Sequence, residues 1–402
     1  MEELSVEVDN EFILSQRFRY INFNTPDHWT ISDIINRQAI LNKDRVAIEF
    51  LSGEEWTYSC CLKFSLEAAG KIKTLGIRRN EALAIMTESA EEFTYFWLGA
   101  AILGVRLVAL NTGLRGNVLE HQLSQSQSRL IIHDERFLEY VQLCESEVPL
   151  YSLESLKNLK ISKLGSKEIF SSKPSDISCI MFTSGTSGPS KGVLMPEAHC
   201  VLFGIGTVEN YNLLETDIFY ICLPLFHANG LFMQLLASLI AGSKAVIRDK
   251  FSASCWLEDI RKSKATHTNL LGATASFVIA QQETKEDKDH NLRVIGAAPL
   301  ATASEIQFRN RFSVKSVIPL YGMTEVNIPL YGKLDEMGNG SCGKLYDKFF
   351  EVEIRNSHTD QPVRLGETGE IMVRPKLPFG FMAGYIGMAE KTVESWRNFW
   401  FH

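Results

Sequence analysis

Short apolar runs alternate with amphipathic stretches over most of the chain. Residues 46–50, 82–86 and 105–110 are apolar and rich in small or β-branched side chains, which predicts buried strands. Between the first two, residues 62–75 carry apolar side chains at helical spacing, and Gly76 follows where a left-handed C-terminal residue is expected. Strands and helices that alternate in this way predict a largely parallel sheet with helices on both faces.

The pattern changes twice along the chain. Residues 150–175 are polar and lysine-rich and are expected to form a surface excursion, and near residue 340 short strands with turns predict a small antiparallel unit. We therefore predict an α/β protein with two mostly parallel sheets flanked by helices, plus a small antiparallel β subdomain. The expected organisation is an N-terminal arm over 1–29 and a large domain over 30–402, divided into subdomains at 30–175, 176–338 and 339–402.

Composition narrows the class of protein. Of the 402 residues, 45% are hydrophobic and 22% charged, as in ordinary globular proteins, and the net charge of −7 argues against a nucleic-acid partner. The acidic N-terminus lacks the features of a signal peptide, and the most apolar segment, 95–110, is short for a membrane span and contains Arg106. Eight scattered cysteines without a Cys-x-x-Cys pair indicate neither a zinc site nor a disulfide framework. We expect a cytoplasmic protein with no integral membrane segment.

One stretch gathers glycines, hydroxyls and a cation between two predicted strands. Backbone N–H groups of a glycine-rich turn, hydroxyl donors and a mobile lysine are the components of a phosphate site, although a plain Ser/Gly hairpin is the alternative. The nucleotide-binding loop that ends in Gly-Lys-Ser/Thr is excluded, because Ser190 precedes Lys191 and Gly192 follows it. The remaining members of the stretch are Thr183, Ser184, Gly185, Thr186, Ser187 and Gly188.

Three further segments stand at or near the ends of predicted strands, where α/β sheets bind ligands. They are Pro224–Gly230, Gly296–Leu300 and Tyr321–Glu325. Each also has a structural explanation. His227 could be a half-buried loop histidine, and Gly-Ala-Ala-Pro is a common sequence. Residues 321–325 could begin a helix that Thr324 caps and whose dipole Glu325 favours.

The order Thr-Ser-Gly-Thr-Ser-Gly-x-x-Lys-Gly, followed later by Tyr-Gly-Met-Thr-Glu, resembles the AMP-forming, adenylate-forming enzymes. These include acyl-CoA synthetases, luciferases and nonribosomal adenylation domains. One departure is that Pro189 stands one place early, with Ser190 where the family usually has proline. Later segments agree, so the resemblance covers nearly the whole chain from about residue 30, and it looks most similar to the crotonobetaine/carnitine-CoA ligase-like branch. The later segments are Ser341–Leu345, Gly366–Glu370 and Val373–Pro375.

The resemblance implies roles for individual residues. Tyr321 would stack on adenine, Thr324 would donate to the α-phosphate, and Glu325 would ligate Mg²⁺. Lys191 would bind phosphate, with Thr324 and Glu325 completing the implied catalytic set. The implied ATP-binding residues are Thr183, Ser184, Gly185, Thr186, Ser187, Gly188, Lys191, Gly296, Ala297, Ala298, Pro299, Tyr321, Gly322, Met323 and Thr324. The implied acyl-substrate residues are His227, Ala228, Gly230, Leu271 and Gly272.

The implied activity is that of the large N-terminal domain of an acyl-CoA synthetase. It would use ATP, Mg²⁺ and coenzyme A, with a small carboxylic acid as substrate, and it leaves room for a homodimer. Relatives continue with a ribose-binding aspartate and a mobile domain that carries the catalytic lysine. We therefore expect the chain as given to lack that C-terminal domain and to have little activity alone. Two other classes stay open: a module that loads a carrier protein, and a non-catalytic ATP- or AMP-binding protein. Ala228 and Asn229 offer no aspartate for an amino group, which disfavours amino-acid substrates.

Overall fold

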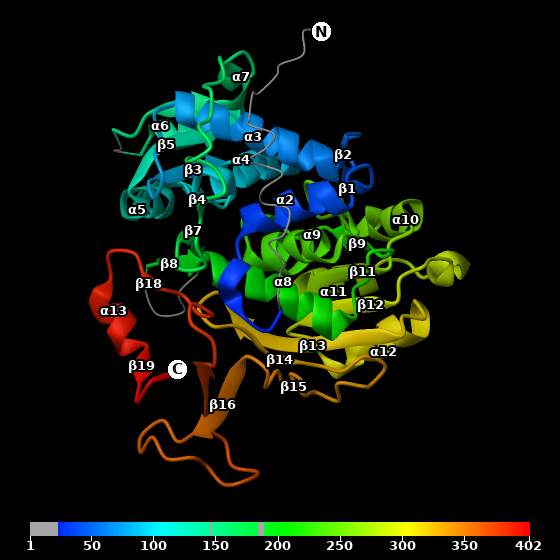
Figure 1. Ribbon diagram of the computed structural model, residues 1–402. Helices are drawn as coiled ribbons and strands as arrows, with labels where there is room; N and C mark the ends of the chain where they lie inside the picture. Colours follow the sequence, from blue (N-terminus) through cyan, green and yellow to red (C-terminus); the bar gives the residue numbers. More distant parts are fainter. Residues whose placement is uncertain (1–22, 145–146, 184–188) are drawn as a thin grey trace.

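The computed structural model describes residues 23–144, 147–183 and 189–402, and its centre is a layer of helices between two large sheets (Figure 1). The predicted α/β class, with two mostly parallel sheets and a small antiparallel one, is confirmed. Among the helices of the described residues, none has the length and the apolar run needed to span a bilayer.

The larger sheet has nine strands, of which the six from β13 to β1 are parallel and the outer three antiparallel. The last two strands of the order below, Val46–Phe50 and Glu55–Thr57, come from the N-terminal part of the chain. Residues 46–57 therefore lie in a different sheet from the rest of the expected first subdomain. The order is β15 (Lys344–Leu345), β14 (Asn327–Tyr331), β13 (Ser316–Met323), β12 (Val294–Ala298), β11 (His267–Leu271), β9 (Ile218–Ile221), β10 (Lys244–Ile247), β1 (Val46–Phe50) and β2 (Glu55–Thr57).

The second sheet has seven strands and is parallel from β7 to β6. Its edge strand β18 comes from the C-terminal part of the chain, beyond the expected boundary at residue 338, and pairs antiparallel with β8. The order is β18 (Gly384–Tyr385), β8 (Lys191–Pro196), β7 (Ile177–Thr183), β4 (Arg106–Ala109), β3 (Ala82–Met86), β5 (Ser128–His133) and β6 (Leu150–Ser152).

Alternate side chains of each parallel strand face opposite helical layers. In β3, Leu83 and Ile85 join the central core, whereas Ala84 and Met86 join the outer core under α5 and α6. Because both faces are covered, the strand reads as a continuous apolar run. The central helices are α2 (Ile31–Leu41), α3 (Tyr58–Thr74), α4 (Ala90–Leu103), α8 (Glu197–Tyr211), the π-helix η4 (Asn229–Leu236) and α9 (Ala237–Ala241).

The outer faces carry two smaller helical layers. Helices α5 (Gly116–Ser126) and α6 (Leu138–Gln142) cover the seven-stranded sheet. Helices α10 (Ala253–Ser263), α11 (Gly272–Ile279) and α12 (Thr302–Arg311) cover the nine-stranded sheet. The short helices η2 (Pro26–His28), η3 (Glu135–Phe137), α7 (Leu153–Leu156) and η5 (Lys285–Lys288) lie in connections.

Residues 150–175 are not the plain surface excursion that their polarity predicted. They include β6, which pairs with β5, and α7. Leu164, Ile169 and Phe170 are buried in the central core, so a few apolar anchors fix a segment that is otherwise polar.

The predicted antiparallel unit is present as a four-stranded sheet near the C-terminus (Figure 1). Its strands are β16 (Phe350–Arg355), β17 (Glu370–Pro375), β20 (Trp400–Phe401) and β19 (Trp396–Arg397), and α13 (Ala389–Glu394) precedes β19. The segment between β17 and α13 returns to the seven-stranded sheet through β18, which brings Tyr385 beside the start of β8. The C-terminal part of the chain therefore contributes directly to the region around Lys191.

Candidate functional site

A cavity of about 570 Å³, here called the main cavity, opens at the carboxyl ends of β11, β12 and β13. Strand ends at this edge of a parallel sheet are the usual ligand-binding positions of α/β proteins. The lining residues are Phe203, His227–Asn229, Met233, Leu271, Ala297–Leu300, Pro319–Thr324, Ile328 and Gly340–Cys342.

The three segments that the sequence placed at strand ends meet in this cavity. His227 and Ala228 directly precede η4, Ala297 to Pro299 lie at the end of β12 and just after it, and Tyr321 to Thr324 lie at the end of β13 and just after it. Strand β12 extends through Ala298, so the Gly-Ala-Ala sequence ends that strand and does not follow it. Leu271 at the end of β11 also lines the cavity.

Three glycines that were predicted to contact the ligands do not line the main cavity. Close packing against neighbouring atoms explains why these positions are glycine. A Cβ atom at Gly230 would lie 2.5 Å from the carbonyl oxygen of Pro224, and one at Gly272 would lie 2.9 Å from that of Pro299. A Cβ atom at Gly296 would lie 1.7 Å from the hydroxyl of Tyr211. These glycines let neighbouring chain segments approach one another behind the cavity.

Glu325 lies in the turn between β13 and β14, two strands that pair as an antiparallel hairpin. The alternative of a helix N-terminus at residues 321–325 is therefore wrong. The Glu325 side chain is 8% exposed, and its Oε1 accepts a hydrogen bond of 3.0 Å from the hydroxyl of Tyr385. A longer contact of 3.5 Å joins the same oxygen to Oγ1 of Thr183.

Tyr385 connects the predicted acidic and basic residues of the site. Its hydroxyl binds Glu325, and Nζ of Lys191 lies 4.5 Å from the centroid of its ring, a cation–π distance. Burial, together with the neighbouring Glu325 carboxylate, raises the pKa of Tyr385, so the phenol stays a neutral donor. Sequence reasoning missed Tyr385 as a site residue, because its role depends on β18 returning to β8.

The glycine-rich loop connects β7 to β8. Thr183 and Lys191 are paired across the two strands at the base of the loop. The predicted phosphate-binding residues Ser184, Gly185, Thr186, Ser187 and Gly188 lie outside the described residues. Nε2 of His121 lies 3.0 Å from the carbonyl oxygen of Ser190, and Nε2 of Gln122 donates to its hydroxyl at 3.2 Å. Helix α5 thus holds Ser190, the residue between Pro189 and Lys191, in place.

Thr324 is fixed through its backbone by a buried histidine. Nε2 of His199 lies 2.7 Å from the carbonyl oxygen of Thr324, and Nδ1 lies 2.8 Å from that of Gly380. Burial lowers the pKa of His199 to about 4, so the ring is neutral at pH 7. A neutral ring has one N–H group. With that proton on Nε2 it donates to Thr324, and Nδ1 can accept from Nδ2 of Asn327 at 3.3 Å, so the ring fixes the turn after β13 without adding charge.

The ring of His227 is exposed at the mouth of the cavity, yet partial desolvation by the surrounding walls lowers its pKa. This histidine is neutral at pH 7 and adds no charge to the mouth of the cavity. Burial likewise raises the pKa of Tyr321, so its phenol ring is neutral and suited to stacking. The rings of His227 and Tyr321 therefore both present uncharged surfaces to the main cavity.

The described residues contain no cluster of three or more acidic, histidine or cysteine side chains that could hold a metal ion by themselves. Glu325 still fits Mg²⁺, because Oε1 takes both of its described contacts and Oε2 accepts none from the described residues. Mg²⁺ is usually bound by one or two carboxylates plus water and phosphate oxygens. A single carboxylate with one oxygen free is compatible with that kind of site.

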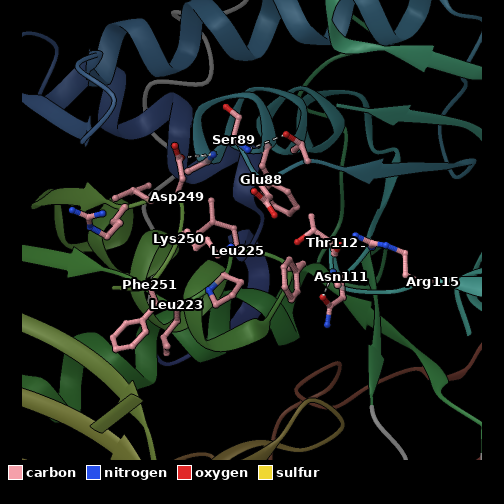
Figure 2. Close-up of a pocket in the computed structure, with 18 residues that line it drawn as sticks. Glu88, Ser89, Asn111, Thr112, Arg115, Leu223, Leu225, Asp249, Lys250 and Phe251 are labelled. Carbon is pink, nitrogen blue, oxygen red and sulfur yellow. Dashed lines mark hydrogen bonds between the residues drawn. The ribbon is translucent and has the colours of Figure 1, made fainter. Parts of the chain in front are cut away.

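A second cavity of about 460 Å³ lies between the two large sheets. Figure 2 shows Asp249 beside the first turn of α4, where its Oδ1 accepts a 2.9 Å hydrogen bond from the backbone N–H of Ala90. The two cavities share the segment before η4. Phe226 lines the second cavity and His227 the main cavity, and their ring centroids lie 4.7 Å apart.

Comparison with known families identifies the class of protein that this fold and site define. The sequence model of the AMP-binding enzymes matches residues 35–386, and the chain belongs to this family. The resemblance drawn from the sequence motifs is thereby confirmed.

Individual relatives are more distant. The chain is 26% identical to 2-succinylbenzoate–CoA ligase of Bacillus licheniformis over 91% of its own length and 74% of the relative. It is 28% identical to crotonobetaine/carnitine–CoA ligase of Shigella sonnei over 75% of its length and 61% of the relative. The chain thus spans about three fifths to three quarters of these ligases.

Solved structures confirm the fold. O-succinylbenzoate coenzyme A synthetase from Bacillus subtilis in complex with AMP superposes with a TM-score of 0.80 at 24% identity, over 93% of this chain and 74% of that one. ATP-bound MatB from Rhodopseudomonas palustris gives a TM-score of 0.82 at 21% identity, over 95% and 75%.

Proposed function

We propose that the protein activates a carboxylic acid with ATP and transfers the acyl group to coenzyme A. The observation that carries this proposal is the main cavity, in which the segments assigned to nucleotide and acyl group face one space. Family membership supports it, as do the two CoA ligases among the relatives. A cytoplasmic location, where ATP and coenzyme A are available, belongs to the same proposal.

In the first step a carboxylate oxygen of the acid forms a bond to the α-phosphorus of ATP. The bond from that phosphorus to the bridging oxygen breaks, and pyrophosphate leaves with the bonding electrons. In the second step the thiol sulfur of coenzyme A bonds to the acyl carbon, its proton is lost, and AMP leaves.

The residues act mainly by position and charge. The hydroxyl of Thr324 would donate to an α-phosphate oxygen, since His199 holds the backbone of that residue in place. Lys191 would neutralise phosphate charge, and Tyr321 would stack on adenine. Glu325 would hold Mg²⁺, which, when bound, offsets the charge of the phosphates.

The acceptor thiol would approach through the second cavity. This cavity and the main cavity meet at Phe226 and His227, so a group in one lies close to a group in the other. His227 lies where the two cavities meet, and its ring is neutral. It would therefore add no charge near the acyl carbon and the thiol that react.

Titration calorimetry with the whole chain tests the nucleotide site. MgATP is expected to bind, and Lys191→Ala should weaken it about tenfold, because a charge-assisted contact is lost. Lys250→Ala in the second cavity is the matched control and should leave MgATP affinity unchanged. Equal affinity for wild type and Lys191→Ala would remove Lys191 from the site.

A stable mimic of an acyl-adenylate separates the proposed activity from its alternatives. An acyl sulfamoyl adenosine fills both parts of the main cavity and should bind at least about tenfold more tightly than AMP, since the acyl group buries apolar surface. A non-catalytic nucleotide-binding protein would bind AMP and the mimic equally well. A module that loads a carrier protein would bind the mimic but give no binding of free coenzyme A to the mimic complex.

A further inference from the structure

Helix α5 contacts the base of the glycine-rich loop with two polar side chains to which the proposed chemistry assigns no role. Nε2 of His121 lies 3.0 Å from the carbonyl oxygen of Ser190, and Nε2 of Gln122 lies 3.2 Å from its hydroxyl oxygen. A carbonyl oxygen only accepts, so the ring nitrogen of His121 that faces it carries a proton. An amide and a hydroxyl can each donate or accept, so the link between Gln122 and Ser190 does not depend on which of them donates. Two adjacent residues therefore hold one loop residue by its backbone and by its side chain.

The helix that carries these two side chains is anchored in the core. Leu119 and Leu123 flank the pair in the sequence, and both are buried in the outer core of the seven-stranded sheet. They share this core with Ile180 of β7, and Leu194 of β8 packs against it. The glycine-rich loop connects these same two strands. Helix α5 is therefore a support that is fixed relative to both ends of the loop.

Packing alone does not explain a glutamine at position 122. Gln122 is 5% exposed, and its Oε1 is buried without a hydrogen-bond partner among the described residues. Burying an amide with one unsatisfied atom costs free energy that an apolar side chain of the same size would not lose. The hydrogen bond to Ser190 is the contact that a methionine in this place could not make.

The contact with Ser190 bears directly on Lys191, which follows it as the first residue of β8. Lys191 is paired with Thr183 across the two strands. Beyond it, the carbonyl oxygen of Gly192 accepts a 2.8 Å hydrogen bond from the backbone N–H of Ile386. The backbone is thus fixed on both sides of the lysine, and α5 supplies the fixed point on the side of the loop.

We propose that His121 and Gln122 are positioning residues, which hold Ser190 so that the side chain of Lys191 is directed at the phosphates of ATP. This inference rests on the proposed acid activation. Thr324 is assigned to the α-phosphate there, which leaves the β- and γ-phosphates to Lys191. AMP lacks these two phosphates, so the pair contributes to the binding of MgATP and not to that of AMP.

Titration calorimetry with the whole chain compares the two nucleotides. Gln122→Met keeps the shape of the side chain but removes the hydrogen bond. It should weaken MgATP binding about fivefold, the value of one net hydrogen bond, and leave AMP binding unchanged. Ser190→Ala removes the other partner of the same bond and should give the same result, even if the methionine variant does not fold. Gln125→Met in the same helix is the matched control, because the described contacts of Ser190 do not include Gln125.

Two variants of His121 test the contact with the backbone. His121→Phe keeps a ring but removes the N–H group, so it should also weaken MgATP binding about fivefold. His121→Gln keeps an N–H donor at a similar reach and should restore most of the affinity. Rescue by the donor would show that the hydrogen bond matters, since a phenylalanine fills the space of the histidine better than a glutamine does.

A double variant tests whether the pair acts through Lys191. In a chain that already carries Lys191→Ala, Gln122→Met should cause no further loss of MgATP affinity, because the charge that it positions is absent. A residue that only stabilised the fold would lower the affinity by the same factor in both backgrounds.

The outcomes separate the two proposals. If the wild type binds neither MgATP nor AMP, the proposed function fails. If Lys191→Ala weakens MgATP binding but Gln122→Met and His121→Phe keep the affinity of the wild type, the positioning role is overturned. It is also overturned if these variants weaken AMP as strongly as MgATP, or if Gln122→Met causes the same loss with and without Lys191.

Discussion

The two cavities lie on either side of Phe226 and His227, but they use their polar groups differently. In the second cavity, several of the charged side chains are engaged with the surrounding fold. Arg248 binds Asp259, Glu88 binds Arg136, and Asp249 binds the first turn of α4. Asn229 lines the main cavity, and Glu325 follows the cavity-lining Thr324. Each is held by one oxygen, and its other polar atom has no partner among the described residues.

This contrast separates charged groups that stabilise the fold from polar groups that remain for a ligand. Charges that already have protein partners stabilise the contact between the sheets and have less to offer a ligand. Groups that are oriented by buried neighbours but keep one polar atom for the cavity are arranged for binding. Three substitutions would break or sharpen this comparison.

The largest effect is expected for Glu325→Gln. The amide keeps the shape and the bond from Tyr385 but loses the charge that Mg²⁺ requires, so MgATP affinity should fall on the order of 100-fold. Calorimetry with and without Mg²⁺ measures it, and the loss should be confined to the magnesium form. Glu88→Gln in the second cavity is the control. An equal loss without Mg²⁺ would show that Glu325 does not act through the metal.

A smaller effect, on stability, is expected for Arg248→Met. Nε and Nη2 of Arg248 donate to Asp259 at 2.5 and 3.1 Å, and the Tyr220 hydroxyl donates to the same carboxylate at 2.7 Å. Without the arginine, a nearly buried carboxylate loses its counter-charge, and the free energy of unfolding should fall by about 2 kcal/mol. Urea denaturation measures this change.

The surface pair of Lys262 and Glu258 provides the control for that stability change. Lys262→Met should alter the free energy of unfolding by less than about 0.5 kcal/mol, because both partners are exposed. MgATP affinity should be unchanged in both variants. A tenfold loss of MgATP affinity in folded Arg248→Met would contradict the view that Arg248 stabilises the fold and does not contribute to nucleotide binding.

The smallest effect is expected for Tyr385→Phe. Removing the hydroxyl frees Glu325 to rotate, and loss of such an outer partner of a metal ligand costs about tenfold in affinity. Calorimetry with MgATP measures it. Tyr346→Phe is the control, since Tyr346 makes the same kind of bond to Glu209 away from both cavities. If both variants bind MgATP equally well, Tyr385 does not position Glu325.

Much of the fold could be predicted from local sequence. The predicted left-handed residue Gly76 follows α3 with a φ of +82°, and Thr30, a residue type typical of N-caps, caps α2 through the backbone N–H of Asp33. The strand ends that carry Tyr321 to Thr324 and His227 to Ala228 were also predictable, and they do meet in one cavity. Apolar periodicity and short motifs are local properties, so one sequence suffices to read them.

Local sequence could not predict which sheet a short strand joins. Strands β1 and β18 each lie in a sheet formed mainly by a distant part of the chain. Residues 321–325 were also compatible with a helix start, because a threonine followed by an acidic residue occurs both at helix N-termini and in hairpin turns. Pairing between distant strands decided both cases.

The sequence by itself determined the α/β class, the glycine-rich loop and the site residues that stand at strand ends. The tertiary structure alone decided that Tyr385 stands between Lys191 and Glu325, and that Gln234 and Asn269 both contact Asn229 at the wall of the main cavity. The physical reason is that a hydrogen bond has a direction. Which atom of a polar side chain remains for a ligand depends on the neighbours that occupy its other atoms, and these come from distant parts of the chain.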